Sequence, residues 1–133
     1  SIQFVYAGVQ LGNIRRALIQ PGLNSGNFTS ITPIGLTQTP GGIGSEFGEF
    51  VTNFRLNPDN TEDLYYVNFN RLFRTNSAST VNSGSWTELT GVGAAVNPTD
   101  PTGGTDVEIR SLGFSRGPYA TSHVLYMGTT SGN

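Results

Sequence analysis

The chain repeats itself. The segment NSGNFTSIT at residues 24–32 reappears, lightly changed, as NSGSWTELT at residues 82–90. A second match lies upstream, where residues 4–8 align with residues 64–68 and again with residues 124–128, so that Tyr6, Tyr66 and Tyr126 are spaced by 60 residues. A period of 58 to 60 residues, built from short β-rich segments, indicates a propeller or another array of repeats rather than one irregular domain.

Each repeat reads as four strands. In the complete copy we expect strands over residues 50–57, 64–69, 71–75 and 86–90, with a Pro-Asp-Asn turn after the first and a Ser/Asn/Gly connection before the last. The second strand is apolar nearly throughout, which is typical of a strand buried on both faces. We expect the Pro/Gly-rich residues 91–106 to form a linker, and no helix of useful length anywhere in the chain.

The other residues read as parts of neighbouring repeats. Residues 3–9, 14–18 and 28–32 match the second, third and fourth strands, and residues 107–115 and 124–128 match the first and second. Residues 13–20 are the one helical candidate, but their repeat partner at 71–74 favours a strand.

The predicted fold is therefore all-β, with four-stranded antiparallel blades of a β-propeller, of which about two blades are present. The expected divisions are residues 1–48 (the last three strands of one blade and a linker), 49–106 (a complete blade and its linker) and 107–133 (the first two strands of the next). Because closed propellers usually have 4–8 blades, we expect this propeller to be incomplete. Gly12-Asn13 also aligns with Gly132-Asn133, so both ends of the chain match the same second strand.

The composition limits the classes of function. Charged residues are 12% of the chain, the formal net charge is −2 and every basic residue is Arg, so we expect no nucleic-acid partner. No apolar run approaches the length of a membrane-spanning helix, so no membrane insertion is expected. Cysteine is absent, which excludes disulfides and thiolate metal sites. Aromatic residues at 11% and many β-branched residues argue against disorder.

The turn before the fourth strand carries a recognisable motif. Thr80-Val81-Asn82-Ser83-Gly84-Ser85-Trp86 holds a Thr, an Asn, a Gly and a Trp in this order, and residues 23–28 repeat it with Gly26 and with Phe28 in place of Trp. This order resembles the Asp-box of BNR-type β-propellers, with Asn82 for Asp and one residue fewer before Trp86. The group includes sialidases, xyloglucan-active glycosidases and sortilin-like receptors. The resemblance covers nearly the whole chain.

The resemblance implies a structural box formed by Asn82, Gly84 and Trp86, and by Gly26 and Phe28 in the first copy. In such a turn the Asn or Asp hydrogen-bonds backbone N–H groups, Gly supplies a positive φ angle, and the Trp caps the apolar layer between blades. In the families that it resembles, the box usually lies away from the active site.

The same families suggest catalytic candidates. Sialidases use an arginine cluster with a tyrosine nucleophile, and the xyloglucan-active enzymes use two aspartates. The corresponding residue types here are Arg15, Arg16, Arg71 and Arg74 on third strands and Tyr6, Tyr66 and Tyr126 on second strands. Because these positions repeat, we interpret them as structural.

Acidic residues gather in two segments. Asp59, Glu62 and Asp63 lie in one expected turn, and Asp100, Asp106 and Glu108 lie in another. A pair of carboxylates can act as acid and base in glycoside cleavage, but both segments read first as solvated loops.

Metal and modification sites are weakly indicated. The acidic turn at residues 59–63 offers oxygen ligands of the kind that Ca²⁺ accepts, without the spacing of a defined loop. His123 has no second His or Cys nearby, so a structural role is expected. Asn27-Phe28-Thr29 fits the glycosylation sequon, but Phe28 is expected to be buried there. We predict no metal and no cofactor.

Two functional hypotheses remain. The first is a non-catalytic propeller segment that acts in binding or assembly outside the cytoplasm and is completed by further blades or partner chains. Its ligand is a protein or a carbohydrate, with Tyr65, Tyr119 and Phe69 as aromatic candidates that have an equally good packing role. The alternative is part of a glycoside hydrolase whose catalytic residues lie largely elsewhere. A third hypothesis, a recombined protein of two repeats, predicts near-identical copies, whereas the copies in this chain diverge.

Overall fold

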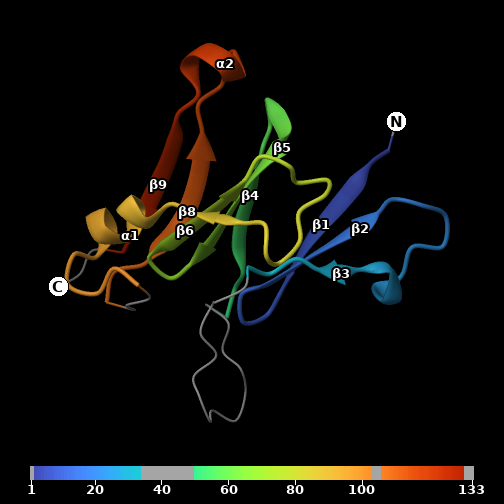
Figure 1. The fold of residues 1–133 in the computed structure, drawn as a ribbon, viewed down its shortest axis with the longest axis horizontal. Helices are drawn as coiled ribbons and strands as arrows, with labels where there is room; N and C mark the ends of the chain where they lie inside the picture. Colours follow the sequence, from blue (N-terminus) through green and yellow to red (C-terminus); the bar gives the residue numbers. More distant parts are fainter. Residues whose placement is uncertain (1, 34–49, 103–105, 131–133) are drawn as a thin grey trace, which may run out of the picture.

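The computed structural model describes residues 2–33, 50–102 and 106–130 (Figure 1). They form three antiparallel sheets in chain order. Sheet 1 consists of β1 (Phe4–Val9), β2 (Asn13–Leu18) and β3 (Thr29–Ser30). Sheet 2 consists of β4 (Asn53–Asn57), β5 (Asn60–Asn68), β6 (Arg71–Thr75) and β7 (Thr87–Glu88). Sheet 3 is the hairpin of β8 (Ile109–Phe114) and β9 (Leu125–Thr129).

Three short helical segments connect these strands. They are the 3-10 turn η1 (Ser25–Asn27) and the helices α1 (Thr90–Val96) and α2 (Tyr119–Ser122). The described chain is thus mostly β, as predicted. The order β4-β5-β6-β7 of sheet 2 follows the chain, so that each strand pairs with the next.

The predicted strands are present with different ends. The third strand matches β6 at both ends, and residues 13–18 form a strand, as their repeat partner indicated. The fourth strand is only two residues long in both copies, and the first begins at Asn53 rather than residue 50.

The prediction that the chain has no helix of useful length was wrong. Helix α1 begins at Thr90, the last residue of the expected fourth strand, and continues into the expected linker, where Val92 and Val96 pack against the core between sheets 2 and 3. Tertiary packing thus stabilises a seven-residue helix whose Gly-containing sequence gives little helical signal of its own.

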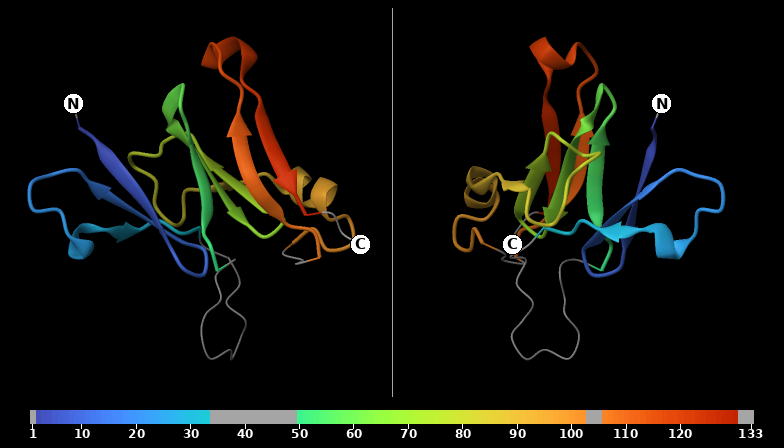
Figure 2. Two further views of the ribbon diagram at one scale, coloured as in Figure 1. Left: turned by 180° about the vertical axis from the view of Figure 1, so that it is seen from behind. Right: turned by 45° about the vertical axis from the view of Figure 1, so that its right-hand side comes forward.

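The sheets lie face to face, with sheet 2 in the middle (Figure 2). One apolar cluster fills the space between sheets 1 and 2, with Ile14 and Ile31 from sheet 1 and Leu64 and Tyr66 from sheet 2. The other fills the space between sheets 2 and 3. Its buried members are Tyr65, Val67, Leu72, Ile109 and Leu112.

Strand β5 serves both clusters. Leu64 and Tyr66 point toward sheet 1, whereas Tyr65 and Val67 point toward sheet 3, as the alternation of a β-strand requires. All five residues from Leu64 to Asn68 are buried. The prediction that this strand is covered on both faces is confirmed.

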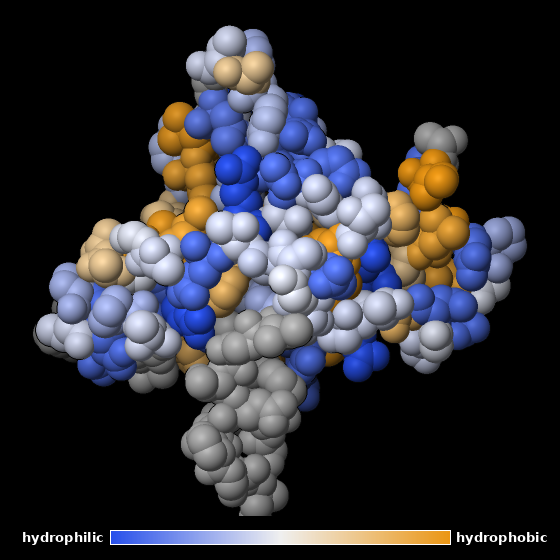
Figure 3. Space-filling model, in the orientation of Figure 1, coloured by the Kyte–Doolittle hydropathy of each residue, from blue (hydrophilic) through white to orange (hydrophobic). Residues whose placement is uncertain are grey.

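The two outer sheets leave apolar side chains in solvent. On the side of sheet 1 that faces away from sheet 2, Val9 is 43% exposed, and on the corresponding side of sheet 3 Tyr126 is 62% exposed. Figure 3 shows hydrophobic colour along β9 and at the start of β1. Within the described ranges, the other large apolar residues that are exposed are Ile2, Leu18, Ile19, Leu23, Phe50, Val51, Val124 and Met127.

Candidate functional site

A row of three paired residues runs across neighbouring strands of sheet 1 and is repeated in sheet 2. In sheet 1, Tyr6 lies opposite Arg16, and Arg16 lies opposite Thr29. In sheet 2, Tyr65 lies opposite Arg74, and Arg74 lies opposite Thr87. The two rows have the same composition, Tyr-Arg-Thr, and each Tyr and Arg faces the following sheet.

This row corrects the equivalence of Tyr6, Tyr66 and Tyr126. Tyr6 corresponds to Tyr65 in the structure, because both pair with an arginine that faces the next sheet. Tyr66 instead faces the preceding sheet and donates its hydroxyl to the carbonyl oxygen of Gly12, 2.6 Å away. Tyr126 is exposed on the outer face of sheet 3. The three tyrosines therefore make no common cluster.

Each arginine of the row bonds to the following repeat. Arg16 donates from Nη1 to the carbonyl oxygen of Ala78 at 2.8 Å, and its guanidinium lies 5.3 Å from the ring centroid of Phe4. Arg74 donates from Nη2 to the hydroxyl of Tyr119 at 3.0 Å. Thus Arg16 links sheet 1 to the repeat of sheet 2, and Arg74 links sheet 2 to the repeat of sheet 3.

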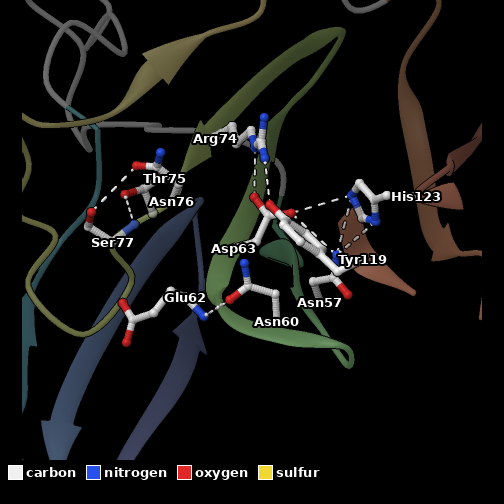
Figure 4. A network of polar contacts seen from close by, with 10 residues as sticks. All are labelled: Asn57, Asn60, Glu62, Asp63, Arg74, Thr75, Asn76, Ser77, Tyr119 and His123. Carbon is white, nitrogen blue, oxygen red and sulfur yellow. Dashed lines mark hydrogen bonds and ion pairs between the residues drawn. The ribbon is translucent and has the colours of Figure 1, made fainter. Parts of the chain in front are cut away.

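A polar cluster surrounds Arg74 between sheets 2 and 3 (Figure 4). The carboxylate of Asp63 is fully buried and accepts a hydrogen bond from Arg74 Nε at 2.6 Å. Its other oxygen accepts from Asn57 Nδ2 at 3.3 Å and lies 3.4 Å from His123 Nε2. Because a buried carboxylate needs several partners, this set of neighbours offsets the cost of burying Asp63.

The imidazole of His123 lies close to two polar side chains. Its Nε2 is 3.4 Å from the Asp63 carboxylate, and its Nδ1 is 3.0 Å from Asn57 Nδ2. The ring also stacks on Phe114 at 5.6 Å and contacts the ring of Tyr119 at 4.9 Å. His123 has the structural role that the sequence indicated, and it makes this contact from the end of α2.

The cluster shifts the titration of Tyr65. Burial, followed by the negative charge of Asp63, raises the pKa of Tyr65 to about 12, although the nearby Arg74 acts in the opposite direction. The hydrogen bond to Asp63 raises the pKa of Arg74. The phenol of Tyr65 therefore stays neutral and the guanidinium stays charged, and neither is poised to exchange a proton near neutral pH.

A cleft of about 580 Å³ lies between sheets 1 and 2. Phe4 and Tyr6 line it from β1, Leu56 and Thr61 from the β4–β5 hairpin, and the carboxylate of Glu62 lies beside them. Burial raises the pKa of Tyr6, which is neutral at physiological pH. The cleft offers two aromatic rings, one carboxylate and hydroxyl groups, a mixture of apolar surface and a few polar groups that is common in ligand-binding pockets.

The structural box is a pair of matching Asx turns. Asn82 Oδ1 accepts from the backbone N–H of Gly84 at 2.9 Å, and Asn24 Oδ1 accepts from the N–H of Gly26 at the same distance. Neither glycine has a positive φ, so that expectation was wrong. At Gly26 the reason for glycine is space, because a Cβ atom would lie 3.2 Å from the side-chain oxygen of Asn24.

The aromatic residue after each turn is half-buried. Trp86 packs against Tyr66 with ring centroids 6.0 Å apart, at the cluster between sheets 1 and 2. Phe28, in the sequon, is likewise half-buried, and the side chain of Asn27 accepts from the backbone N–H of Asn24 at 2.8 Å.

The expectation that the acidic residues lie in solvated loops holds for Asp59, Asp100 and Asp106 but is wrong for Glu62, Asp63 and Glu108. Glu62 and Asp63 lie within β5, because the strand begins at Asn60 rather than at residue 64. Glu62 accepts from the backbone and hydroxyl of Ser79 at 3.0 and 2.9 Å.

The remaining acidic residues are scattered. Asp59 faces Arg116 at 3.7 Å, and Glu108 is buried beside Arg110. Asp100 and Asp106 are exposed. Among the described residues, no three His, Cys, Asp or Glu side chains are grouped so as to hold a metal ion.

The remaining candidates also have packing or structural contacts. Arg71 makes a two-pronged ion pair with Glu88, with both N–O distances 2.8 Å, and Arg15 is exposed on the outer face of sheet 1. Phe69 forms the β5–β6 turn with φ of 55°, and its carbonyl accepts from Ile109. The cluster of Asp63 with His123 was missed from the sequence, since the two residues are far apart and neither lies in a motif.

The chain was compared with protein-family models, with curated proteins and with solved structures, and nothing matched. Within the described residues, none of the helices has the length and apolar character needed to span a bilayer. The arrangement of the sheets is therefore the basis for a functional assignment.

Proposed function

We propose that this chain is a non-catalytic β-propeller segment that acts in binding or assembly and is completed by further blades or partner chains. One observation carries the proposal: the same Tyr-Arg-Thr row recurs on successive sheets and links each sheet to the next repeat. A contact that recurs with the repeat can continue to further sheets on either side.

The exposed faces of the outer sheets support this proposal. Sheet 2 is covered on both sides, whereas Val9 on sheet 1 and Tyr126 on sheet 3 lie in solvent. These outer faces correspond to faces of sheet 2 that are covered. Apolar residues exposed on such a face are available for contact with a further sheet or a partner chain.

The side chains that suggested catalysis favour the same assignment. Asp63 is held by Arg74 and Glu62 by Ser79. An acid and base pair for glycoside cleavage needs one carboxyl group that can exchange a proton beside the scissile bond. These two carboxylates are committed to contacts that hold the fold together.

Sedimentation velocity over a concentration range tests the proposal. We expect concentration-dependent association of the chain, and we expect Tyr126→Lys to weaken it, because the charge would sit on the outer face of sheet 3. Asn76→Lys is the matched control, since Asn76 is exposed and follows the end of β6 rather than lying on an outer face or in the Tyr-Arg-Thr row. A monomer at every concentration that unfolds in a single cooperative step would contradict the proposal.

A further inference from the structure

The two interfaces between sheets differ at one equivalent place. Between sheets 2 and 3, the tip of the β8–β9 hairpin folds into α2 and sets Tyr119 and His123 against Arg74 and Asp63. Between sheets 1 and 2, the β4–β5 hairpin stays paired as far as Asn57 and Asn60. The space beside Tyr6, the counterpart of Tyr65, is then left open as the 580 Å³ cleft.

Strand β1 also lacks a neighbour that its counterpart β5 has. Strand β5 pairs with β4 on one edge and β6 on the other, whereas β1, among the described residues, pairs only with β2. Ile19 donates its N–H to the carbonyl of Gln3, so alternate residues from Gln3 bond to β2. The backbone groups of Phe4 and Tyr6 therefore point to the other edge, beside the cleft.

We propose that the edge of β1 and the adjoining cleft bind an extended peptide, which adds to sheet 1 as a further strand. Such strand addition takes its affinity from backbone hydrogen bonds and its specificity from pockets for alternate side chains. The inference rests on the proposed role in assembly and names the kind of partner for one site. The partner is a separate polypeptide segment in extended conformation.

The residues of β4 that pair with β5 indicate which side chains the peptide should carry. Arg55 lies opposite Tyr65 and on the same face, while the neighbouring Phe54 and Leu56 point to the other face. On β1, a residue opposite Tyr6 would enter the cleft on the side of Glu62. The peptide therefore alternates polar or basic side chains, facing the Glu62 carboxylate, with apolar ones that cover the outer face of sheet 1.

A synthetic peptide with the sequence of residues 51–59, VTNFRLNPD, is a direct probe, since this segment already pairs with a second strand. Fluorescence anisotropy of the labelled peptide titrated with the chain should show saturable binding. Two further peptides carry a backbone N-methyl group at the position of Phe54 or of Arg55. Because only alternate N–H groups face β1, one of them should bind about tenfold more weakly than the other, the equivalent of one or two hydrogen bonds.

Two variants of the chain locate the site. Thr61 is exposed and lines the cleft, so Thr61→Trp should fill the cleft and lower peptide affinity severalfold. Asn76→Trp, at an exposed residue that does not line the cleft, should leave the peptide affinity unchanged. Circular dichroism melts of both variants check the fold, and amide exchange should slow at Phe4 and Tyr6 when the peptide binds.

The outcomes separate this site from the proposed function. Absence of binding, equal affinity of the two N-methyl peptides, or equal effects of the two Trp variants would overturn strand addition, while association through the outer faces could still be observed. Competition between peptide binding and self-association of the chain would make a second copy the occupant and overturn the assignment to a separate peptide. Peptide binding to a chain that stays monomeric would support the site and contradict the outer-face association.

Discussion

The indole N–H of Trp86 donates to the backbone carbonyl of Ile31 across 2.6 Å, and this bond joins sheet 2 to sheet 1. The ring also contacts Tyr66, which is fully buried in the same cluster. Trp86 is half-buried rather than buried as a whole, so its aromatic edge and its hydrogen bond contribute together.

We predict that Trp86→Phe costs about 1 kcal/mol, because it keeps most of the packing and loses the hydrogen bond. Trp86→Ala should cost about 3 kcal/mol, the lower end for a large aromatic, because part of the ring is in solvent. Urea unfolding followed by circular dichroism measures both, since the chain has no other tryptophan for fluorescence. Equal losses in the two variants would assign the effect to the hydrogen bond alone.

The buried carboxylate of Asp63 gives the second prediction. Asp63→Ala removes the partner of Arg74, Asn57 and His123, while the side chain of Arg74 is 36% exposed and keeps its hydrogen bond to Tyr119. Leaving the less exposed groups around Asp63 without a partner costs about 1–3 kcal/mol. The loss should be accompanied by faster amide exchange in sheet 3, since the contacts to α2 depend on this cluster.

The matched control is Asp59→Ala. Asp59 faces Arg116 at 3.7 Å, and the side chain of Arg116 is 76% exposed. A pair in solvent contributes about 0–1 kcal/mol. Comparable losses at Asp59 and Asp63 would mean that burial of the Asp63 cluster contributes nothing special to stability.

The ion pair of Glu88 gives a prediction for the stability of the protein at acidic pH. The two-pronged hydrogen bond from Arg71 lowers the pKa of Glu88 below its ordinary 4.5. A depressed folded-state pKa contributes stability that is present above the unfolded value and lost as pH falls through the folded one. The free energy of unfolding should thus fall below about pH 4.5, and Glu88→Gln should flatten that part of the profile. An unchanged slope in the variant would refute the assignment.

The sequence was sufficient to predict the β-rich repeat and the third strand, because alternation and turn residues are local signals. The burial of β5 on both faces was also visible in its continuous apolar run from Leu64 to Val67. The sequence was not sufficient to predict the register in which the strands of the two repeats correspond. The β1–β2 turn is one residue longer than the β5–β6 turn, so Tyr6 corresponds to Tyr65, and the match with Tyr66 is a coincidence of spacing.

The polar cluster around Asp63 depends on contacts between residues far apart in the chain, which no local sequence pattern indicates. Asp63 and His123 are brought together by the stacking of sheet 3 on sheet 2, and Asp63 was placed in a turn because the strand was expected to begin at residue 64. Helix α1 was not predicted for a similar reason, because it is stabilised by the packing of its valines rather than by the helix propensity of its sequence. The Asx turns of the box were predictable, because an Asn two residues before a Gly is itself a turn signal.

The last prediction concerns Tyr65 at alkaline pH. Its pKa of about 12 lies above the ordinary value of 10.0, because the ring is 4% exposed and Asp63 lies beside it. A phenol with a raised folded-state pKa contributes stability that is fully present below pH 10 and is lost as pH rises toward 12. The wild-type free energy of unfolding should therefore decline above about pH 10, and Tyr65→Phe should remove part of that decline. Absorbance at an ultraviolet wavelength specific for tyrosinate should show, in the wild type but not in Tyr65→Phe, one group that ionises only near pH 12. Tyr126→Phe, at an exposed ring, is the control that should leave this late step in place, and a late step that survives in Tyr65→Phe would show that another tyrosine produces it.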